Sequence, residues 1–260
     1  MSRIKVSTLK IEKLTPRQIE EMWDLYQYGY EHVDKQTFLN DIKTKNYIFL
    51  GLNSETSKVE GFSTVHFFKT KLNKKSYNII FSGDTIFHPK HWGSRALNKA
   101  MAIFMIKNIL LSPFTPLVWN LIVSGHRTLL IMAKNCPEYY PNYKTKTPER
   151  LEKLRHHIGT LQFPNTYNSK TGIIEFEDAT AVFSETLDPK YQEVLKMNEV
   201  QYFLSLNPGY RKGNELNMIA NMSIKSMLIT SYKTFTKLTK FKLKSLKTTL
   251  IFRRVFNESK

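Results

Sequence analysis

The chain has 260 residues, of which 41% are hydrophobic and 23% charged, a balance typical of a folded globular protein. Lysine and arginine number 39 against 22 aspartate and glutamate, and the net charge of +17 predicts anionic partners: phosphates, nucleic acid or an acidic membrane face. The single cysteine, Cys136, excludes an internal disulfide and suits a reducing compartment.

The first residues contain no apolar signal-peptide core, and no window reaches eighteen apolar residues without charges. We therefore expect a cytoplasmic protein without a spanning helix, with peripheral contact to the inner membrane face as a further expectation.

The first part of the chain predicts a strand, two helices and three more strands, over residues 4–12, 15–30, 34–45, 46–52, 61–72 and 77–87. Thr15 is expected as the N-cap of the first helix, with Pro16 at its first position and Gln18 at its third. Gly83, inside the last of these strands, predicts a β-bulge or a close backbone approach.

The remaining elements are expected as helix, strand, helix, helix, strand, helix and strand, over residues 94–110, 117–124, 126–135, 147–159, 172–177, 188–207 and 215–221. Up to residue 143 the order is therefore β-α-α-β-β-β-α-β-α. We predict three regions: a domain over residues 1–143, an α/β extension over 144–221 and a basic tail over 222–260.

The junction between the third consecutive strand and the helix at 94–110 has the sequence HPKHWGSR, residues 88–95. A strand that runs directly into a helix leaves backbone N–H groups of the first helical turn unpaired, and the helix dipole makes that end an anion site. Gly93 lets the backbone approach a ligand, and Lys90, His91 and Arg95 add positive charge. A pyrophosphate fits this description.

The element order and the HPKHWGSRAL turn resemble the GNAT superfamily of acyltransferases, in which a Q/R-x-x-G-x-G/A loop cradles the pyrophosphate of coenzyme A. On that pattern Lys90 matches the first Gln or Arg and Gly93 matches the first glycine. Arg95 replaces the second Gly or Ala, a departure that leaves its effect on phosphate binding open. The resemblance covers roughly residues 3 to 143. It implies an α+β fold in which helices flank a mixed, mostly antiparallel sheet.

The resemblance also implies the site. Residues expected to bind the cofactor are Ile86, Phe87, His88, Lys90, His91, Trp92, Gly93, Ser94, Arg95 and Asn135. A tyrosine, Tyr140 or Tyr139, is expected to protonate the leaving thiolate. Asp84, on the strand beside the expected cleft, is a candidate proton acceptor from the attacking group.

Each of these roles has a structural alternative. The basic turn is also what a solvated helix start would show, and Tyr139 and Tyr140 are also what packing aromatics near a helix end would be. His88 and His126 are further candidates for proton transfer, although a single histidine is more often structural. The sequence contains no metal-binding motif, no P-loop and no dinucleotide fingerprint, so we predict no metal.

Residues 224–256 combine lysine, arginine, aromatic and branched residues without a single acidic side chain. This composition is typical of a segment that lies on an anionic bilayer, and a solvated tail or a helix packed on the domain is the alternative. Nucleic acid is not the expected partner, because no recognised binding module is present.

The function expected from these observations is acyl transfer from a CoA or carrier-protein thioester to an amine or hydroxyl, on a small-molecule or lipid-like acceptor. The alternative is a non-catalytic acyl-CoA-binding module, or a peripheral membrane or nucleic-acid adaptor that works through its basic tail.

Overall fold

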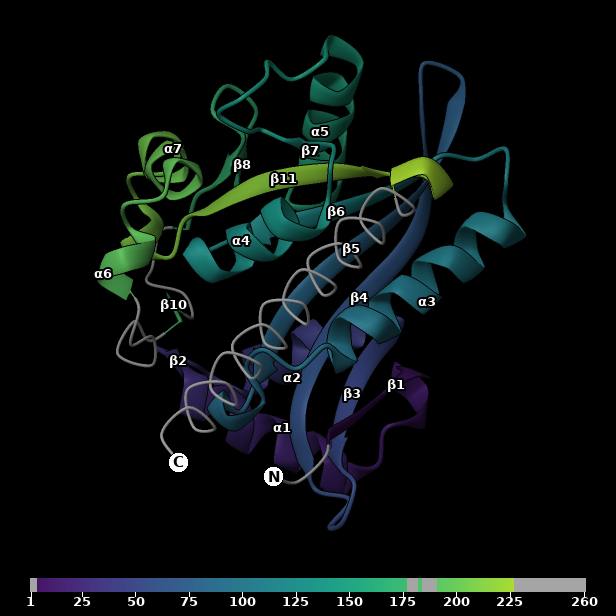
Figure 1. Ribbon diagram of the computed structural model, residues 1–260, viewed down its shortest axis with the longest axis vertical. Coiled ribbons are helices and arrows are strands. Elements are labelled where there is room, and N and C mark those ends of the chain that lie inside the picture. Colours follow the sequence, from purple (N-terminus) through teal and green to yellow (C-terminus); the bar gives the residue numbers. More distant parts are fainter. Residues whose placement is uncertain (1–3, 177–181, 184–190, 227–260) are drawn as a thin grey trace, which may run out of the picture.

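The computed structural model describes residues 4–176, 182–183 and 191–226, and it is organised around one large mixed sheet (Figure 1). The strand order is β1-β3-β4-β5-β6-β11-β9-β8, and β7 also pairs with β11. The strands are β1 (Ile4–Lys10), β3 (Tyr47–Asn53), β4 (Val59–Leu72), β5 (Lys75–Phe87), β6 (Leu117–Val123), β7 (Tyr139–Tyr140), β8 (Tyr167–Asn168), β9 (Ile173–Ile174) and β11 (Glu215–Met222). The helices are α1 (Pro16–Gly29), α2 (Lys35–Thr44), α3 (Ala96–Leu111), α4 (His126–Asn135), α5 (Glu149–Gln162), α6 (Tyr191–Val194) and α7 (Asn198–Leu206).

Every pair of neighbouring strands in this sheet is antiparallel except one, because β5 and β6 run parallel. A parallel pair needs a crossover connection, and α3 supplies it. The expected α+β class, a mostly antiparallel mixed sheet flanked by helices, is confirmed.

The two faces of the sheet carry different helices (Figure 1). On one face α3 and α4 pack with α7 over a core that includes Phe104, Leu129 and Phe203. On the other face α1 and α2 cover β3 and β4, while α5 covers β5, β6 and β11. Side chains alternate between the two cores along each strand, so the parity of a strand residue decides which face it joins.

The start of α1 has the predicted capping geometry. The Thr15 side chain accepts a hydrogen bond from the Gln18 backbone, the Gln18 side chain accepts one from the Thr15 backbone, and Pro16 occupies the first turn. Because both bonds satisfy donors that the helix itself leaves unpaired, this local sequence fixes where α1 begins.

The bulge predicted at Gly83 is present. The β4–β5 register is Ser63 with Thr85 and then Val65 with Ser82, so Gly83 and Asp84 together lie opposite Thr64. In a bulge of this kind, the two residues that oppose a single partner both point to the same side of the sheet. Here that side is the face of α1, α2 and α5, because the Asp84 carboxylate lies 3.4 Å from the Tyr26 hydroxyl of α1.

The C-terminal part contributes to the same sheet. β11 pairs with β6 over seven residue pairs, from Leu216 with Val123 to Met222 with Leu117. A separate two-stranded sheet joins β10 (Val182–Phe183) to β2 (Tyr30–Glu31), two short strands that the sequence did not predict. Such short pairs depend on tertiary contact and leave no periodic pattern.

The single helix predicted over residues 188–207 is two helices, α6 and α7, in the described residues that begin at Tyr191. Met197 takes an extended conformation at the break, and Leu195 and Met197 pack against the core under α4. Tertiary packing here overrides a continuous helical pattern. The basic tail predicted over residues 222–260 lies outside the described residues from residue 227 onward.

Candidate active site

The parallel strands β5 and β6 are paired over five residues and then separate. The register runs from Asn78 with Leu117 to Ser82 with Leu121, and β5 then continues to Phe87 without a partner on that side. Because β5 carries its bulge directly after the last pair, the two strands separate at Gly83. Backbone groups of both strands are therefore available near the point of separation.

The turn that follows β5 brings the expected anion-binding groups to its surface. Pro89–His91 form a short 3-10 helix, and Gly93 has a φ of 86°, in the left-handed region that favours glycine. A Cβ at Gly93 would meet nothing within 4 Å, so its backbone faces open space. Ser94 accepts a hydrogen bond from the Ala96 amide, and the first turn of α3 begins there with Arg95 as N-cap.

Lys90 and His91 are held by a carboxylate of the neighbouring strand. Glu60 of β4 lies 2.5 Å from the Lys90 ammonium and 2.6 Å from His91 Nε2, and it also accepts a hydrogen bond from Asn53. Burial alone would raise the pKa of Glu60, but the bonds from Asn53, Lys90 and His91 lower that pKa to about 2. Lys90 therefore positions the turn, and its charge is partly neutralised before any ligand arrives.

Two further cations lie at this end of the sheet. The guanidinium of Arg127, on α4, stacks 3.5 Å from the centre of the Trp92 ring, while the Trp92 indole donates to the Phe87 carbonyl. This contact ties the start of α4 to the turn before α3. Arg95 is exposed at the N-cap of α3. Positive charge and two helix N-termini therefore gather on the α3–α4 face, where the dipoles favour an anion.

The remaining residues predicted around this turn have structural contacts. Ile86 is buried against α1, the ring of Phe87 lies over Gly61, and His88 accepts a hydrogen bond from the Lys90 amide. His88 also stacks with Tyr28, at 5.8 Å between ring centres. His126 is buried beside Tyr191.

Asp84 lies on the opposite face, directly after the point where β5 and β6 separate. Some of its surface remains exposed, yet the surrounding protein desolvates the carboxylate. This desolvation, together with the charge of Asp41, raises the pKa of Asp84 to about 7, although Lys45 and the Tyr26 hydroxyl act in the other direction. A carboxylate with a pKa near 7 is suited to accept a proton at neutral pH.

Glu215, at the start of β11, belongs to the same face as Asp84. The alternation along β11 places Leu216 in the core under α4 and Ile219 in the core under α5, so Glu215 points to the α5 side. Desolvation raises the pKa of Glu215 to about 8, and Asp84 is the strongest of the charges that add to this rise. Two carboxylates that disfavour each other's ionisation thus flank the separated strands, one from β5 and one from β11.

A buried lysine completes this cluster. The Lys45 ammonium lies 2.5 Å from Asp41 and 5.6 Å from the centre of the Phe81 ring, and its side chain is only 6% exposed. Next to it is the Thr64 hydroxyl oxygen, which is fully buried and has no hydrogen-bond partner among the described residues. A Cβ at Gly83 would lie 2.5 Å from that oxygen and 2.8 Å from Lys45 Cε, so Thr64 and Lys45 leave no room for a side chain at position 83.

Tyr139, Tyr140 and Asn135 lie apart from the turn at residues 88–95. The two tyrosines form β7, which pairs with β11 and not with β5 or β6. Tyr140 packs against the core under α5, and Tyr139 packs on the opposite face. Asn135 ends α4, roughly 14 Å along the helix from His126, and its amide donates to the Ile131 carbonyl.

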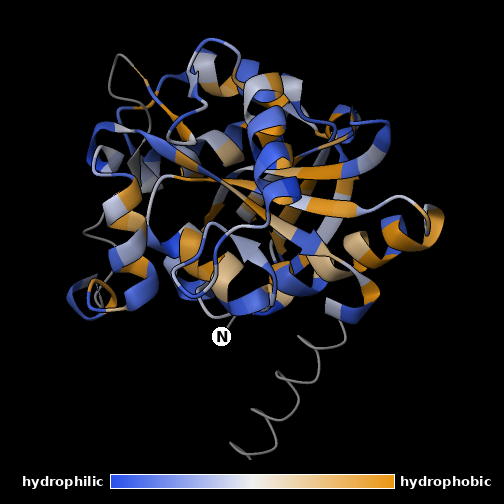
Figure 2. Ribbon diagram, turned by 90° about the horizontal axis from the view of Figure 1, so that it is seen from above, coloured by the Kyte–Doolittle hydropathy of each residue, from blue (hydrophilic) through white to orange (hydrophobic). Residues whose placement is uncertain are grey.

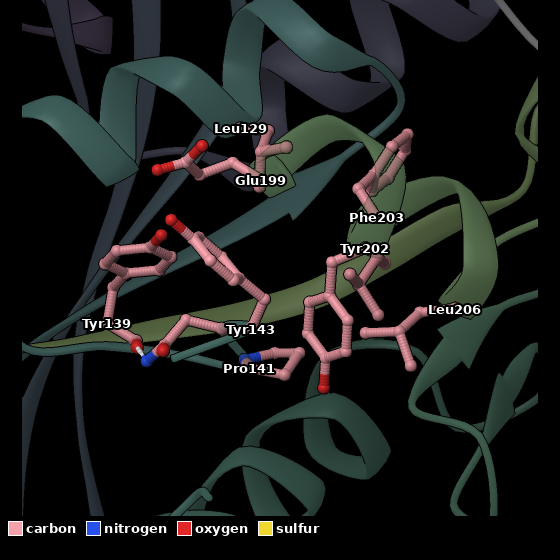
Figure 3. Close-up of a pocket in the computed structure, with 10 residues that line it drawn as sticks. Leu129, Tyr139, Pro141, Tyr143, Glu199, Tyr202, Phe203 and Leu206 are labelled. Carbon is pink, nitrogen blue, oxygen red and sulfur yellow. Dashed lines mark hydrogen bonds between the residues drawn. The ribbon is translucent and has the colours of Figure 1, made fainter. Parts of the chain in front are cut away.

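Two hollows lie near these tyrosines. The first, between β7, α4 and α7, has a volume of about 10 Å³, room for about one water molecule (Figure 3). Figure 3 shows the rings of Tyr139 and Tyr143 close together on the side of Glu199. Burial, Glu199 and Tyr143 raise the pKa of Tyr139 to about 12. The second, about 360 Å³, lies beside Pro141, Arg155 and Lys170. Because β5 and α3 line neither hollow, both are distinct from the separated strands.

Sequence reasoning missed four residues of the candidate site. Glu60 and Arg127 contact the turn after β5, and Lys45 and Glu215 lie with Asp84 on the other face. Glu60 reaches the turn through the β4–β5 pairing of Gly61 with Phe87, and Lys45 reaches the carboxylates from the C-cap of α2. Glu215 reaches the site through a strand more than 130 residues further along the chain than Asp84. The sequence did contain one signal for such residues. A lysine or glutamate within an apolar strand or at a helix end needs a partner when it is buried, so its presence there indicates a polar contact.

Among residues 4–176, 182–183 and 191–226, no group of three His, Cys, Asp or Glu side chains is arranged to hold a metal ion. Within the same residues, no helix combines the length and the apolar character needed to cross a bilayer.

No family model and no curated protein matches the chain. Solved structures do match it. A probable N-acyltransferase from Enterococcus faecalis is 14% identical with a TM-score of 0.39, and the match covers 53% of this chain but only 32% of that protein. The GNAT family N-acetyltransferase YhbS from Escherichia coli, solved with CoA, is 8% identical with a TM-score of 0.34 over 48% of this chain and 66% of that one. A Trypanosoma brucei acetyltransferase is 10% identical with a TM-score of 0.37 over 56% of this chain and 98% of that one.

The names of these proteins agree with the family that the HPKHWGSRAL turn resembles. The match spans about half of this chain and about a third of the Enterococcus faecalis protein.

Proposed function

We propose that the chain is an acyltransferase that moves an acyl group from a CoA thioester, or from the same phosphopantetheine arm on a carrier protein, to an amine or hydroxyl. One observation carries this proposal. The parallel strands β5 and β6 separate after Ser82 and Leu121, with a cationic helix entrance on one face and the Asp84–Glu215 carboxylates on the other.

The donor would bind from the α3–α4 face. Its pyrophosphate accepts hydrogen bonds from the backbone amides at Gly93 and at the first turn of α3, with Arg95 as the exposed cation beside them. The pantetheine arm then passes between the separated strands, where unpaired strand amides bind it and polarise the thioester carbonyl. Lys90 contributes mainly by holding the turn through Glu60.

The acceptor would approach from the α1–α5 face. Its nitrogen or oxygen attacks the thioester carbon, the proton that it loses passes to the Asp84 carboxylate, and the carbon–sulfur bond breaks. Glu215 supports this role because its charge and that of Asp84 disfavour each other, which keeps one proton on the pair near neutral pH. The thiolate that leaves takes a proton and departs as the free thiol.

The residue that protonates the thiolate is proposed from the family resemblance as Tyr140 or Tyr139. The pairing of β7 with β11 leaves one strand between these tyrosines and β6. We therefore expect Tyr140→Phe and Tyr139→Phe to reduce turnover less than Asp84→Asn does, which a comparison of the three variants under saturating donor would test.

The acceptor is proposed to be lipid-like, on the basis of the basic sequence after residue 222. The chain would then work at an anionic membrane surface on the cytoplasmic side.

The decisive experiment is release of free thiol from acetyl-CoA and palmitoyl-CoA by the full chain, with amine and lipid-amine acceptors supplied. We expect turnover that Asp84→Asn lowers by a factor of about 100 or more, as for loss of a general base. Tight donor binding without thiol release for any acceptor would instead identify a non-catalytic acyl-CoA-binding module.

A further inference from the structure

The outer surface of α3 carries a second stripe of apolar residues, opposite the one that packs on the sheet. Among the described residues, nine large apolar side chains are exposed, and five of them lie on α3 or in the turn after it. These five, here called the outer α3 surface, are Ile103, Ile106, Leu110, Leu111 and Phe114. Figure 2 shows α3 as a largely orange helix at the right of the molecule.

The spacing shows that this is one continuous surface. Ile103, Ile106 and Leu110 follow each other at three and four residues, the interval that places side chains on one side of a helix. Phe114 is four residues further on and is 98% exposed. A surface helix normally has polar residues on this side, so a contiguous apolar stripe indicates a contact with another partner.

The charges around the outer α3 surface restrict what that partner is. From residue 85 to residue 137 the chain contains no aspartate or glutamate, and Lys99 and Lys107 are exposed on α3 itself. A second copy of the same surface would bring these cations together. The chain segment after residue 226 has no acidic residue before Glu258, so it offers the same sign of charge.

The described chain also ends close to this surface. Met222 of β11 pairs with Leu117, which is three residues after Phe114, and Ile224 beyond it is exposed. The strand β11, which precedes Ser226, therefore ends beside the segment that follows the apolar stripe. Apolar side chains flanked by lysines, with no acidic residue among them, match the interface of an anionic bilayer.

We propose that the outer α3 surface docks the protein on an anionic lipid bilayer, with Leu110 and Phe114 inserted below the headgroups and Lys99 and Lys107 at the phosphates. This inference does not depend on acyl transfer, because none of these residues belongs to the candidate active site.

Sedimentation of the full chain with phosphatidylserine-containing and pure phosphatidylcholine vesicles tests the proposal. We expect Leu110→Ser combined with Phe114→Ser to lower partitioning onto the anionic vesicles at least tenfold, and Leu161→Ser, an exposed leucine of α5, to leave it unchanged. Lys107→Glu should weaken binding more than Lys43→Glu, an equal change of charge on α2, which covers the other face of the sheet. Equal partitioning of the α3 variants and the unmodified chain would overturn the proposal.

A fluorescent label distinguishes a bilayer from the other groups that could cover the outer α3 surface, namely the chain's own C-terminal segment and a second copy of the protein. Cys136 is buried, so an environment-sensitive dye on Phe114→Cys reports on that position, and Leu161→Cys is the matched control. We expect a blue shift at position 114 that appears only when anionic vesicles are added. A blue shift already present without vesicles would show that the chain's own C-terminal segment or a second copy covers the surface. Dimers that Leu110→Ser with Phe114→Ser converts to monomers would identify the second copy. Either result contradicts membrane docking.

Discussion

Glu60 joins three polar side chains below the turn that follows β5. Its carboxylate accepts from Asn53, Lys90 and His91 and is mostly buried. Because the pKa of Glu60 is lowered to about 2, its ionised form stabilises the fold above the unfolded value near 4.5. That contribution is lost as the pH falls from about 4.5 towards 2.

We predict that Glu60→Gln lowers the free energy of unfolding by roughly 2–3 kcal/mol at pH 7, because it removes the carboxylate that pairs with Lys90 and accepts from Asn53 and His91. Urea unfolding at a series of pH values measures this. The difference from the unmodified chain should disappear near pH 2. Glu55→Gln, an exposed change, is the control, and an equal effect from both variants would show that Glu60 does not anchor the turn.

Asp84 has the opposite linkage. Its pKa is raised to about 7 in the folded chain, so the folded form holds a proton that the unfolded chain releases near 4. Stability is then full at acidic pH and falls as the pH rises from about 4 to about 7.

We predict that Asp84→Asn lowers turnover. At pH 8 it should also raise the free energy of unfolding by roughly 1–3 kcal/mol, a range reduced for the partial contact of Asp84 with solvent, and at pH 4 it should not change that free energy. Thermal unfolding at both pH values measures the change in stability, and thiol release measures the change in turnover. Unchanged turnover would remove Asp84 from the mechanism, and a loss of stability at pH 8 would contradict the raised pKa.

The bulge in β5 is the feature at element scale that creates the site, because it ends the β5–β6 pairing and turns Asp84 to the α1 face. The space above Gly83 is taken by Thr64 and Lys45. We predict that Gly83→Ala destabilises the fold by about 1–3 kcal/mol through overpacking. Chemical denaturation measures this, with Gly125→Ala as control because a Cβ there meets nothing within 4 Å.

Removing the obstructing oxygen gives an internal check. Thr64→Ala in the Gly83→Ala background should restore part of the lost stability. If the double variant is as unstable as the sum of the two single changes, the Thr64 hydroxyl is not the group that the new methyl meets.

The elements with a strong local pattern were predictable from the sequence. Thr15 and Gln18 fix the start of α1, and Gly83 marks the bulge. The helix predicted over residues 94–110 is α3, Ala96–Leu111, and the strand predicted over 117–124 is β6, Leu117–Val123. The break between α6 and α7 was not predictable, because Leu195 and Met197 turn inward to a core formed by residues far away in the sequence.

The candidate site was only half predictable for the same reason. The turn around Gly93 has local sequence cues, and Asp84 follows a local glycine. Glu215 joins the site through the β6–β11 pairing and Glu60 through the β4–β5 pairing, which a single sequence does not reveal. The family resemblance placed the proton donor at Tyr139 and Tyr140, and it contained no information that β11 lies between β7 and β6.

At the scale of the whole molecule, β11 binds the C-terminal part to the N-terminal part. Leu216, Met218 and Ala220 belong to the same core as Phe104 of α3 and Leu129 of α4. The boundary at residue 143 stays a sequence prediction about separate regions, and the shared sheet indicates that residues 1–143 need β11 to fold.

We predict that a chain stopped after residue 226 unfolds cooperatively, and that one stopped after residue 214 does not, because it leaves the β6 edge and this core exposed. Circular dichroism during thermal unfolding compares the two. Cooperative unfolding of the shorter chain at the same temperature would show that β11 adds nothing essential to the sheet.

Calorimetric binding of acetyl-CoA and palmitoyl-CoA, to the full chain and to two charge-reversal variants at the start and in the middle of α3, tests the donor site most directly. Arg95→Glu changes the helix entrance and Lys107→Glu changes the fourth turn, and both variants have the same net charge. We expect the unmodified chain to bind the donor, Arg95→Glu to weaken that binding by about tenfold or more, and Lys107→Glu to leave it unchanged. Absence of binding by the folded, unmodified chain, or equal losses in both variants, would contradict a donor site at the start of α3.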